Sequence, residues 1–206
     1  DTLKVQNGRV YELRRLCKTA IFFVPRKNSK TTSVASLAVE EFLMGDNNAQ
    51  AYTAANSYKQ AQICFKEISK ILRPFDPKKN RFKITRENIR WRETNDYGRE
   101  SIIECMSGGA ETKDGLNASL VIYDEYAAAK YTKDHSEGAE LLQVLTSSMG
   151  VRKEPMVVII TTASRVPNGP FRIELDNAMR TLLGEIDNDS LSAFIFQPDA
   201  WEGADS

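Results

Sequence analysis

Short apolar runs alternate along the chain with longer segments in which apolar residues recur at helical spacing. The first run, Thr19 to Val24, is continuous, which is typical of a strand buried on both faces of a parallel sheet, and Pro25 ends it. The apolar spacing from Lys30 to Met44 predicts an amphipathic helix that ends before Gly45. The main fold is therefore expected to open with a strand followed by a helix.

The same alternation continues to the end of the chain. Helices are expected from Ser57 to Leu72, where Ser57 and Gln60 have the spacing of a capping box, and from about Glu137 to Met149. Further strands are expected at residues 49–56, 101–107, 119–125, 156–164 and 191–197. A last helix follows Asn168-Gly169-Pro170, with an expected buried stripe of Leu175, Ala178, Met179, Leu182 and Leu183. This order predicts an α/β fold with a mainly parallel central sheet flanked by helices and a ligand site beyond the carboxyl ends of the strands.

Two small antiparallel additions are expected beside this sheet. Residues 2–13 alternate around Asn7-Gly8, which is a strong hairpin signal because both residues tolerate positive φ. The second addition follows the helix from Ser57 to Leu72, which Pro74 ends. Phe75 to Glu100 contains short alternating stretches that are expected to form small strands at the sheet edge.

Composition is that of one globular domain, since the 206 residues are 41% hydrophobic and 27% charged. No apolar run reaches the roughly 18 residues of a membrane span, so a cytosolic protein without membrane contact is expected. The chain starts at Asp1 rather than Met, and its last residues are polar and acidic. We interpret it as a fragment with one domain at residues 1–196 and the start of a linker at residues 197–206.

The cysteines and the single histidine argue against two kinds of site. Cys17, Cys64 and Cys105 are scattered and odd in number, so free, mostly buried thiols are expected rather than a zinc site or a disulfide framework. His135 lies in a polar run and is expected in a solvated loop, which leaves a Ser-His-Asp mechanism without its base.

Charge is zero overall but unevenly spread. Residues 1–30 carry eight Lys and Arg against two acids, residues 73–99 carry nine against four, and residues 174–206 carry one against eight. Basic blocks are typical of polyanion binding, although a solvated surface explains the middle block equally well.

A phosphate-binding loop is indicated between the first strand and the first helix. Such loops aim backbone N–H groups at phosphate oxygens, and the pattern GxxxxGK followed by Ser or Thr adds a lysine and a magnesium-binding hydroxyl. Lys30 and Thr31 match the last two positions, whereas Val24 and Ser29 stand where glycines are usual. Taken alone, the stretch fits a basic turn at a helix start better than a nucleotide site.

Two later strand ends carry groups that complete such a site. "LVIYDE" ends in Asp124 and Glu125, the layout of a Walker B motif, in which the first acid holds magnesium and the second polarises the attacking water. "VVIITTAS" places the hydroxyls of Thr161, Thr162 and Ser164 at another strand tip, where they could contact the γ-phosphate. Each fragment is weak alone, because Thr is favoured in strands and strands often end in acids. Their order along the chain indicates a nucleotide site.

The chain resembles the ATPase domain of the large terminase subunit of tailed double-stranded DNA phages. The matching stretches are "FVPRKNSKTT", "YTAANSYKQAQICFKEI", "DGLNASLVIYDEYAAA" and "VVIITTASRVPNGPF", which cover most of residues 22–171. The resemblance implies a P-loop fold of the additional-strand catalytic glutamate type, with ATP and Mg²⁺ as ligands. It further implies a motor that drives double-stranded DNA into a preformed capsid in the host cytoplasm. The implied partners are the capsid portal protein, the small terminase subunit and further copies in a homo-oligomeric ring, and a nuclease domain is expected only beyond Ser206.

The resemblance also assigns roles to individual residues. The implied catalytic residues are Glu125, Arg26 and Lys30, and the implied magnesium ligands are Thr31 and Asp124. The implied nucleotide-binding residues are Arg26, Lys27, Asn28, Ser29, Lys30, Thr31 and Thr32. The implied coupling motif is Thr161, Thr162 and Ala163. An arginine beside the γ-phosphate makes physical sense because it stabilises charge on the equatorial oxygens. Gln6 is a poor match for the family's adenine-contacting glutamine, which usually lies further upstream.

Ser29 departs from the family pattern, which has Gly before the lysine. Forcing a residue with a Cβ into a glycine-like conformation costs about 1 kcal/mol, which is small beside the charge-assisted contacts of Lys30 and magnesium. We therefore predict retained but weakened ATP binding, which a Ser29→Gly variant tests.

DNA contacts are expected mainly to phosphates, because a translocating motor must accept any sequence. The expected DNA-binding residues are Lys78, Lys79, Arg81 and Lys83. Trp91 is expected to pack in the core rather than to stack on DNA. The sequence does not rank three possible trans-acting cations of a neighbouring subunit: Arg99, Lys113 and Arg165.

The rival hypothesis is a catalytically weak P-loop-like module that binds DNA or acts as a scaffold, which the missing loop glycines keep open. A titration with an ATP analogue separates the two hypotheses. A helicase-like ATPase would require motifs on a second recombinase-like domain, and none occur in the sequence.

Overall fold

The computed structural model describes residues 3–6, 9–12, 15–92, 98–107, 115–129, 131–132, 136–162 and 169–196, with side chains from residue 15 onward. Some sequence predictions fall outside these residues: those for Asn7-Gly8, Lys113, His135, Ala163, Ser164, Arg165, Asn168 and the linker at 197–206.

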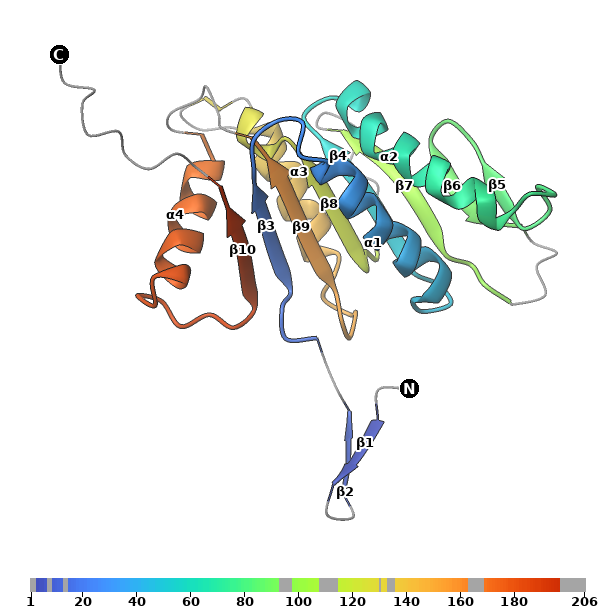
Figure 1. Cartoon of the computed structure of the whole chain (residues 1–206), viewed down its shortest axis with the longest axis horizontal. Coiled ribbons are helices and arrows are strands. Elements are labelled where there is room, and N and C mark those ends of the chain that lie inside the picture. The colour runs from blue at the N-terminus through green and yellow to red at the C-terminus, as the bar shows by residue number, and fades with distance from the viewer. Residues whose placement is uncertain are drawn as a thin grey trace.

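One sheet of eight strands forms the centre of the fold (Figure 1). Six strands are parallel: β3 (Thr19–Phe23), β4 (Gln50–Ala55), β7 (Ile102–Ser107), β8 (Leu120–Asp124), β9 (Met156–Thr161) and β10 (Leu191–Ile195). Two short antiparallel strands complete one edge: β5 (Phe82–Ile84) and β6 (Asn88–Trp91). The spatial order is β10-β3-β9-β8-β4-β7-β6-β5, which confirms the predicted mainly parallel sheet with small antiparallel additions.

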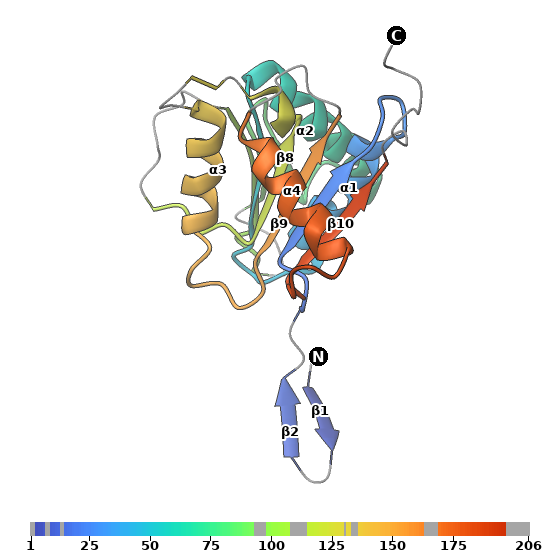
Figure 2. The same ribbon diagram turned by 90° about the vertical axis from the view of Figure 1, so that its left-hand side faces the viewer.

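Helices cover both faces of this sheet (Figures 1 and 2). They are α1 (Lys30–Met44), α2 (Tyr58–Leu72), α3 (Glu137–Ser147) and α4 (Phe171–Leu182), with 3-10 turns η1 (Arg73–Phe75) and η2 (Tyr126–Ala128). Helices α1 and α2 contribute Phe42 and Ile68 to one hydrophobic cluster. Helices α3 and α4 contribute Leu145 and Leu175 to another. None of the helices in the described part of the chain is long and apolar enough to cross a membrane.

Strand β9 lies between β3 and β8, and this placement defines the class of the fold. In P-loop proteins of the additional-strand type, one strand separates the strand that leads into the phosphate loop from the strand that ends in acids. The register pairs Phe23 with Thr161 and Asp124 with Ile160, so β3, β9 and β8 end almost level. Since carboxyl ends of parallel strands meet at one edge, their tips form one surface.

The prediction for the end of α4 was wrong. Leu175 and Ala178 are buried as expected and Met179 is partly buried, but Leu182 is 57% and Leu183 71% exposed. These two residues form the last position and the C-cap of the helix, beyond the hydrophobic cluster that takes Leu175. The apolar spacing therefore continues past the core that the helix covers.

Aromatic rings hold the antiparallel edge in place. Trp91 is 8% exposed, stacks on Phe42 with ring centroids 5.6 Å apart and meets Phe82 edge to face at 4.9 Å. Its indole N–H donates to the carbonyl of Phe42 at 3.3 Å. The expectation that Trp91 packs in the core is confirmed.

A second, two-stranded sheet lies apart from the first. Strands β1 (Leu3–Gln6) and β2 (Arg9–Glu12) pair antiparallel, which confirms the predicted hairpin. The hairpin lies beyond the amino edge of the large sheet (Figures 1 and 2).

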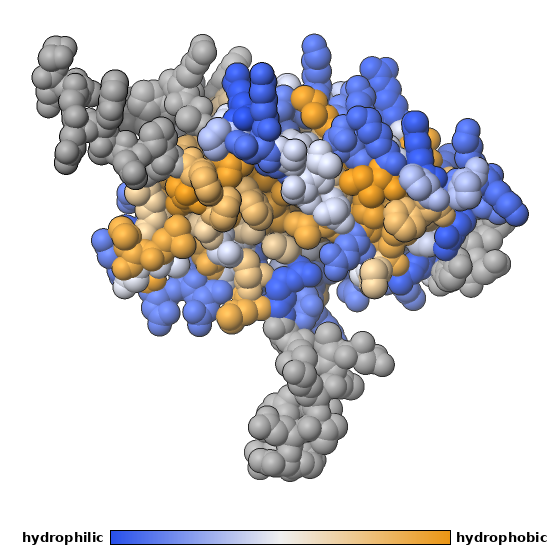
Figure 3. All heavy atoms as spheres, in the orientation of Figure 1, coloured by the Kyte–Doolittle hydropathy of each residue, from blue (hydrophilic) through white to orange (hydrophobic). Residues whose placement is uncertain are grey.

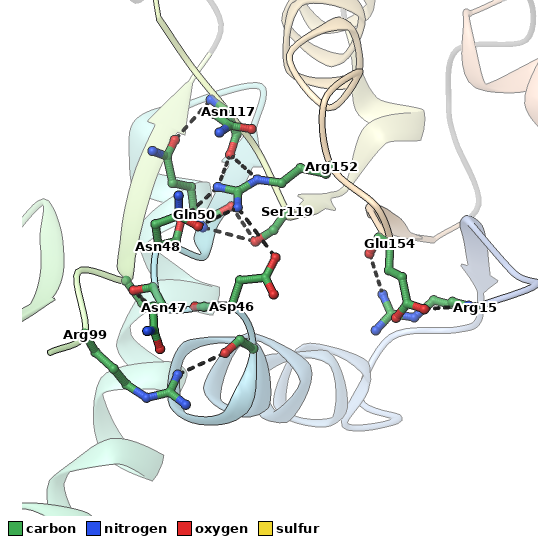
Figure 4. Close-up of polar contacts among 12 residues, drawn as sticks. Arg15, Asp46, Asn47, Asn48, Gln50, Arg99, Asn117, Ser119, Arg152 and Glu154 are labelled. Carbon is green, nitrogen blue, oxygen red and sulfur yellow. Dashed lines mark hydrogen bonds and ion pairs between the residues drawn. The ribbon is translucent and has the colours of Figure 1, made fainter. Parts of the chain in front are cut away.

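Arg152 ties together the loops at the amino edge of the large sheet (Figure 4). Its side chain is 6% exposed, and the guanidinium donates to the carbonyls of Asn117 and Asn48 at 2.8 Å each. These residues precede β8 and β4, and Arg152 itself precedes β9. Nearby, Arg15 donates from its backbone N–H to the Glu154 carboxylate at 3.1 Å. Hydrogen bonds thus stabilise the loops at the amino edge of the sheet. A ligand site is expected at the opposite edge, where the carboxyl ends of the strands lie.

Part of one sheet face is not covered by the described helices. Phe194 on β10 is 53% exposed, and its ring lies 6.4 Å from that of Phe22 on β3 and 5.2 Å from that of Phe196. Figure 3 shows apolar surface beside α1, over these strands. The alternation of β10 between half-buried and exposed residues follows from this one-sided cover.

Candidate active site

The loop between β3 and α1 is folded as a turn with two left-handed residues. Lys27 has φ 67° and Ser29 has φ 50°. The Asn28 side-chain amide donates to the carbonyl of Pro25 at 3.2 Å, and the Val24 N–H donates to the carbonyl of Thr161 at 3.2 Å, which attaches the loop to β9. The Ser29 side chain makes no capping hydrogen bond, so it leaves the first N–H groups of α1 to an incoming anion.

Lys30 meets Glu125 at the tips of the strands. Its Nζ lies 3.0 Å from Glu125 Oε1, and the two side chains are 10% and 22% exposed. The other carboxylate oxygen, Oε2, accepts from the Thr162 hydroxyl at 2.8 Å and from the Thr162 N–H at 3.1 Å. Lys30 and Thr162, which lie 95 and 37 positions from Glu125 in the sequence, are thus brought into one cluster.

Asp124 is buried behind this cluster with one oxygen satisfied and one not. The residue is 1% exposed, and Oδ2 accepts from the Gln60 side-chain amide at 3.0 Å. Oδ1 is buried without a hydrogen-bond partner. Burial raises the pKa of Asp124 to about 6; the Gln60 hydrogen bond lowers this pKa and the negative charge of Glu125 raises it.

A divalent cation fits this environment. The unpartnered Oδ1 of Asp124 is a ligand atom that a magnesium ion would satisfy, and Thr31 lies in the first turn of α1, next to Lys30. The described residues contain no group of three or more His, Cys, Asp or Glu that could hold a metal. One carboxylate with substrate phosphates and water is the usual environment of Mg²⁺, which dehydrates reluctantly.

The structure brings together four of the residues assigned by resemblance. Lys30, Asp124, Glu125 and Thr162 gather as expected, and Arg26 is exposed on the loop that precedes α1. The Thr161 hydroxyl is fully buried and accepts from the Ala127 N–H at 3.0 Å, so it supports the strand tip from inside.

Two residues at the β4–α2 junction contact the acids and were not expected there from the sequence. Gln60 was expected to close a capping box, and its N–H does donate to the Ser57 hydroxyl at 3.3 Å. Its side chain, however, binds Asp124. The Asn56 side-chain amide donates to the carbonyl of Glu125 at 2.9 Å. The sequence does not indicate these two hydrogen bonds, because each joins residues that are far apart in the chain.

The expected DNA-binding residues lie near the opposite edge of the sheet from β10. Lys78, Lys79 and Lys83 are exposed in and before β5. Arg81 is partly buried, with its guanidinium carbon 5.8 Å from the ring centroids of both Phe82 and Trp91. The three lysines therefore remain the more accessible candidates for phosphate contacts.

Ser29→Gly is expected to stabilise the nucleotide-free domain by up to about 1 kcal/mol, because a glycine relieves the left-handed strain, partly offset by the entropy of the unfolded chain. The strain exists before any nucleotide binds, so the gain should appear in chemical denaturation rather than chiefly in ATP affinity. Ser29→Ala is the matched control, since it keeps the Cβ and removes only a hydroxyl without a capping bond. Equal stability of the Gly and Ala variants would show that the left-handed conformation at Ser29 is not strained.

Asp124→Asn is expected to flatten the pH dependence of stability in buffer free of nucleotide and Mg²⁺. The folded-state pKa of about 6 lies above the ordinary value of 3.8, so the ionised form destabilises the fold. The loss of folding free energy caused by ionised Asp124 is absent below the unfolded-state pKa and complete above the folded-state pKa, where it reaches about 3 kcal/mol. Denaturation at pH 4.5 and 7.5 should show the wild type losing stability relative to Asp124→Asn as pH rises. The exposed Asp176→Asn is the control, and a pH-independent difference for Asp124→Asn would refute the buried charge.

The fold and the cluster together define a P-loop type of nucleotide-binding protein. A strand inserted between the loop strand and the acid strand brings a lysine, two acids and a threonine to one edge of a parallel sheet. Sequence comparison then gives the family. The family model of the terminase large subunit ATPase domain matches residues 4–180, so the chain belongs to this family. No curated protein matches the chain.

Solved structures of phage packaging proteins share the fold. The HK97 bacteriophage large terminase has a TM-score of 0.70 and 21% identity, covering 89% of this chain and 36% of that one. The large terminase of a thermophilic bacteriophage in complex with ADP has a TM-score of 0.56 and 13% identity, covering 88% and 40%. The N-terminal domain of the DNA packaging ATPase of bacteriophage phi29 has a TM-score of 0.58 and 13% identity, covering 92% and 94%. The chain thus spans about a third of the HK97 protein, and the likeness is one of fold.

Proposed function

We propose that this domain hydrolyses ATP to ADP and phosphate with Mg²⁺ and that the energy drives double-stranded DNA into a preformed capsid. One observation carries the proposal: Lys30, Glu125 and Thr162 meet directly beside the buried carboxylate of Asp124. A scaffold or DNA-binding module has no need of a lysine and two acids at the strand tips, so the rival hypothesis leaves this cluster without a purpose.

Lys30 exchanges partners when ATP binds. In the free domain its ammonium is paired with Glu125 at 3.0 Å. Phosphate oxygens held by the N–H groups of the loop and the start of α1 lie within reach of the first helical residue, which is Lys30. The ammonium then offsets the charge of the outer phosphates, and Arg26 adds a second cation from the exposed loop.

Glu125 becomes available to the attacking water once Lys30 has turned to the phosphates. Thr162 continues to hold one carboxylate oxygen by two hydrogen bonds, which fixes the direction of the other. That oxygen accepts a hydrogen bond from the water and orients it for in-line attack on the γ-phosphate. Mg²⁺, when held by Asp124 and Thr31, supplies neutralising charge at the outer phosphates. Thr161, Thr162 and Ala163 are proposed as the coupling motif because Thr162 contacts Glu125 directly.

Membership of the family supports a proposal about partners. We propose that the domain acts in the host cytoplasm within a homo-oligomeric ring, with the capsid portal protein and the small terminase subunit. Lys78, Lys79, Arg81 and Lys83 are the proposed contacts to DNA phosphates, which predicts binding that weakens steeply with salt. Lys78 and Lys83 are exposed and thus accessible to such contacts.

Calorimetric titration with a non-hydrolysable ATP analogue and Mg²⁺, followed by a phosphate-release assay with ATP, tests the proposal. Saturable binding at one site and Mg²⁺-dependent phosphate release are expected. A domain that binds no analogue would revive the scaffold hypothesis. A domain that binds the analogue but releases no phosphate in an assembled ring would be a nucleotide sensor rather than a motor.

A further inference from the structure

The backbone of Glu125 adopts a conformation that needs support. Its φ of 55° and ψ of 46° lie in the left-handed region, which a residue with a Cβ occupies at a cost of about 1 kcal/mol or more. This conformation ends β8 and begins the turn η2, so it sets the direction in which the carboxylate leaves the strand. Something must therefore hold the peptide in this orientation.

Asn56 binds the carbonyl of this strained residue. Its Nδ2 donates to the Glu125 carbonyl oxygen at 2.9 Å, and its Oδ1 accepts from the Tyr123 hydroxyl at 3.0 Å. The amide thus uses its donor and its acceptor on two residues of the same strand end, which fixes its orientation. Asn56 follows β4, the strand next to β8, and belongs to neither the phosphate loop nor the strand that ends in the acids.

The far side of this amide is closed by tight packing. Tyr123 is fully buried. A Cβ added at Gly138, in the first turn of α3, would lie 2.8 Å from Asn56 Oδ1 and 2.9 Å from the Tyr123 hydroxyl. The Oδ1 side of the Asn56 amide is therefore closely packed by Tyr123 and the first turn of α3, which supports the hydrogen bond to Glu125.

We propose that Asn56 is a positioning residue that holds the Glu125 peptide so that the carboxylate points to Lys30 and Thr162. The inference rests on the proposed ATP hydrolysis for its effect on rate but not for its geometry. The Glu125 N–H still donates to the carbonyl of Ile160 at 2.7 Å, and the Thr161 hydroxyl still accepts from Ala127, so the turn remains attached without Asn56. The Glu125 carbonyl also accepts from the Ala128 N–H at 3.0 Å within η2. What Asn56 adds is a second restraint on this carbonyl, which links it to the end of β4.

Asn56→Ala and Asn56→Asp test the proposal by separating turnover from binding. The Asp variant keeps the shape but replaces the donor by an acceptor that faces the carbonyl. Both are expected to lower kcat by about 10- to 100-fold, the effect of a slightly misplaced catalytic group. The KM for ATP should stay within about 3-fold of the wild type, and any change should be a decrease, because losing the Lys30 contact frees the ammonium for the phosphates. Tyr123→Phe, which leaves the donor in place, should lose less than Asn56→Ala.

Ser57→Ala is the matched control at the same corner. Ser57 caps α2 through its hydroxyl, so this variant should lower the melting temperature and leave kcat unchanged. If Asn56 were merely structural, its variants would resemble Ser57→Ala.

A crystal structure of nucleotide-free Asn56→Ala provides a readout that does not depend on activity. Glu125 is expected to leave the left-handed region and its carboxylate to lose the 3.0 Å contact with Lys30. An unchanged Glu125 would overturn the proposal, as would unchanged kcat in a wild type that hydrolyses ATP. If the wild type hydrolyses no ATP, the proposed function fails, and the crystal structure alone decides the role of Asn56.

Discussion

Glu125→Gln is expected to abolish ATP turnover while ATP binds as tightly as in the wild type or more tightly. The glutamine keeps the size of the side chain but is neutral, so it orients and polarises the attacking water poorly. The same change removes the ion pair that engages Lys30 in the free domain at 3.0 Å. It also removes a negative charge that would repel the outer phosphates. Turnover and affinity should therefore move in opposite directions.

The expected loss of kcat is about 10²- to 10⁴-fold, the range for a general base, and the expected gain in affinity is a few-fold. Phosphate release and calorimetric titration with ATP measure the two effects on one preparation. Glu40→Gln, on the exposed side of α1, is the matched control and should change neither. Wild-type turnover in Glu125→Gln would refute the proposed mechanism, and weaker ATP binding would refute the competition for Lys30.

The elements that the sequence predicted well are those whose pattern is local. Helix α1 begins at Lys30 and ends at Met44 as expected, because its apolar spacing and the following Gly45 are signals within one element. The apolar run of β8 is buried along its whole length, as a central parallel strand must be. Because such strands end at a common edge, the order of loop, acids and threonines sufficed to predict that Lys30 and Glu125 come together.

The features that the sequence did not predict depend on contacts between elements. Leu182 continues an apolar stripe, but whether it is buried depends on where the core ends. Gln60 has the spacing of a capping box, yet its side chain binds Asp124 because α2 packs beside β8. The role of Asn56 requires the conformation of Glu125, which no pattern of residue types specifies. Tertiary contacts of single polar side chains lie beyond what periodicity can predict.

Lys30→Ala is expected to weaken ATP binding by about 100-fold or more. Hydrogen bonds to charged groups contribute about 1.5–3 kcal/mol each, and a lysine that reaches two phosphates makes more than one. Lys30 is only 10% exposed, so water replaces its ammonium poorly. Titration with ATP and Mg²⁺ measures the loss. Lys66→Ala, which removes the same charge from the exposed side of α2, should bind ATP like the wild type.

The double variant Lys30→Ala/Glu125→Gln decides whether the two residues act through one another. If phosphates and Glu125 compete for the ammonium, part of the affinity gained in Glu125→Gln arises from the release of Lys30 and must vanish when Lys30 is absent. The gain from removing charge repulsion would remain. The two substitutions should therefore combine non-additively in binding free energy. Strict additivity would mean that the 3.0 Å pair does not oppose nucleotide binding, and Lys30 would then serve ATP alone.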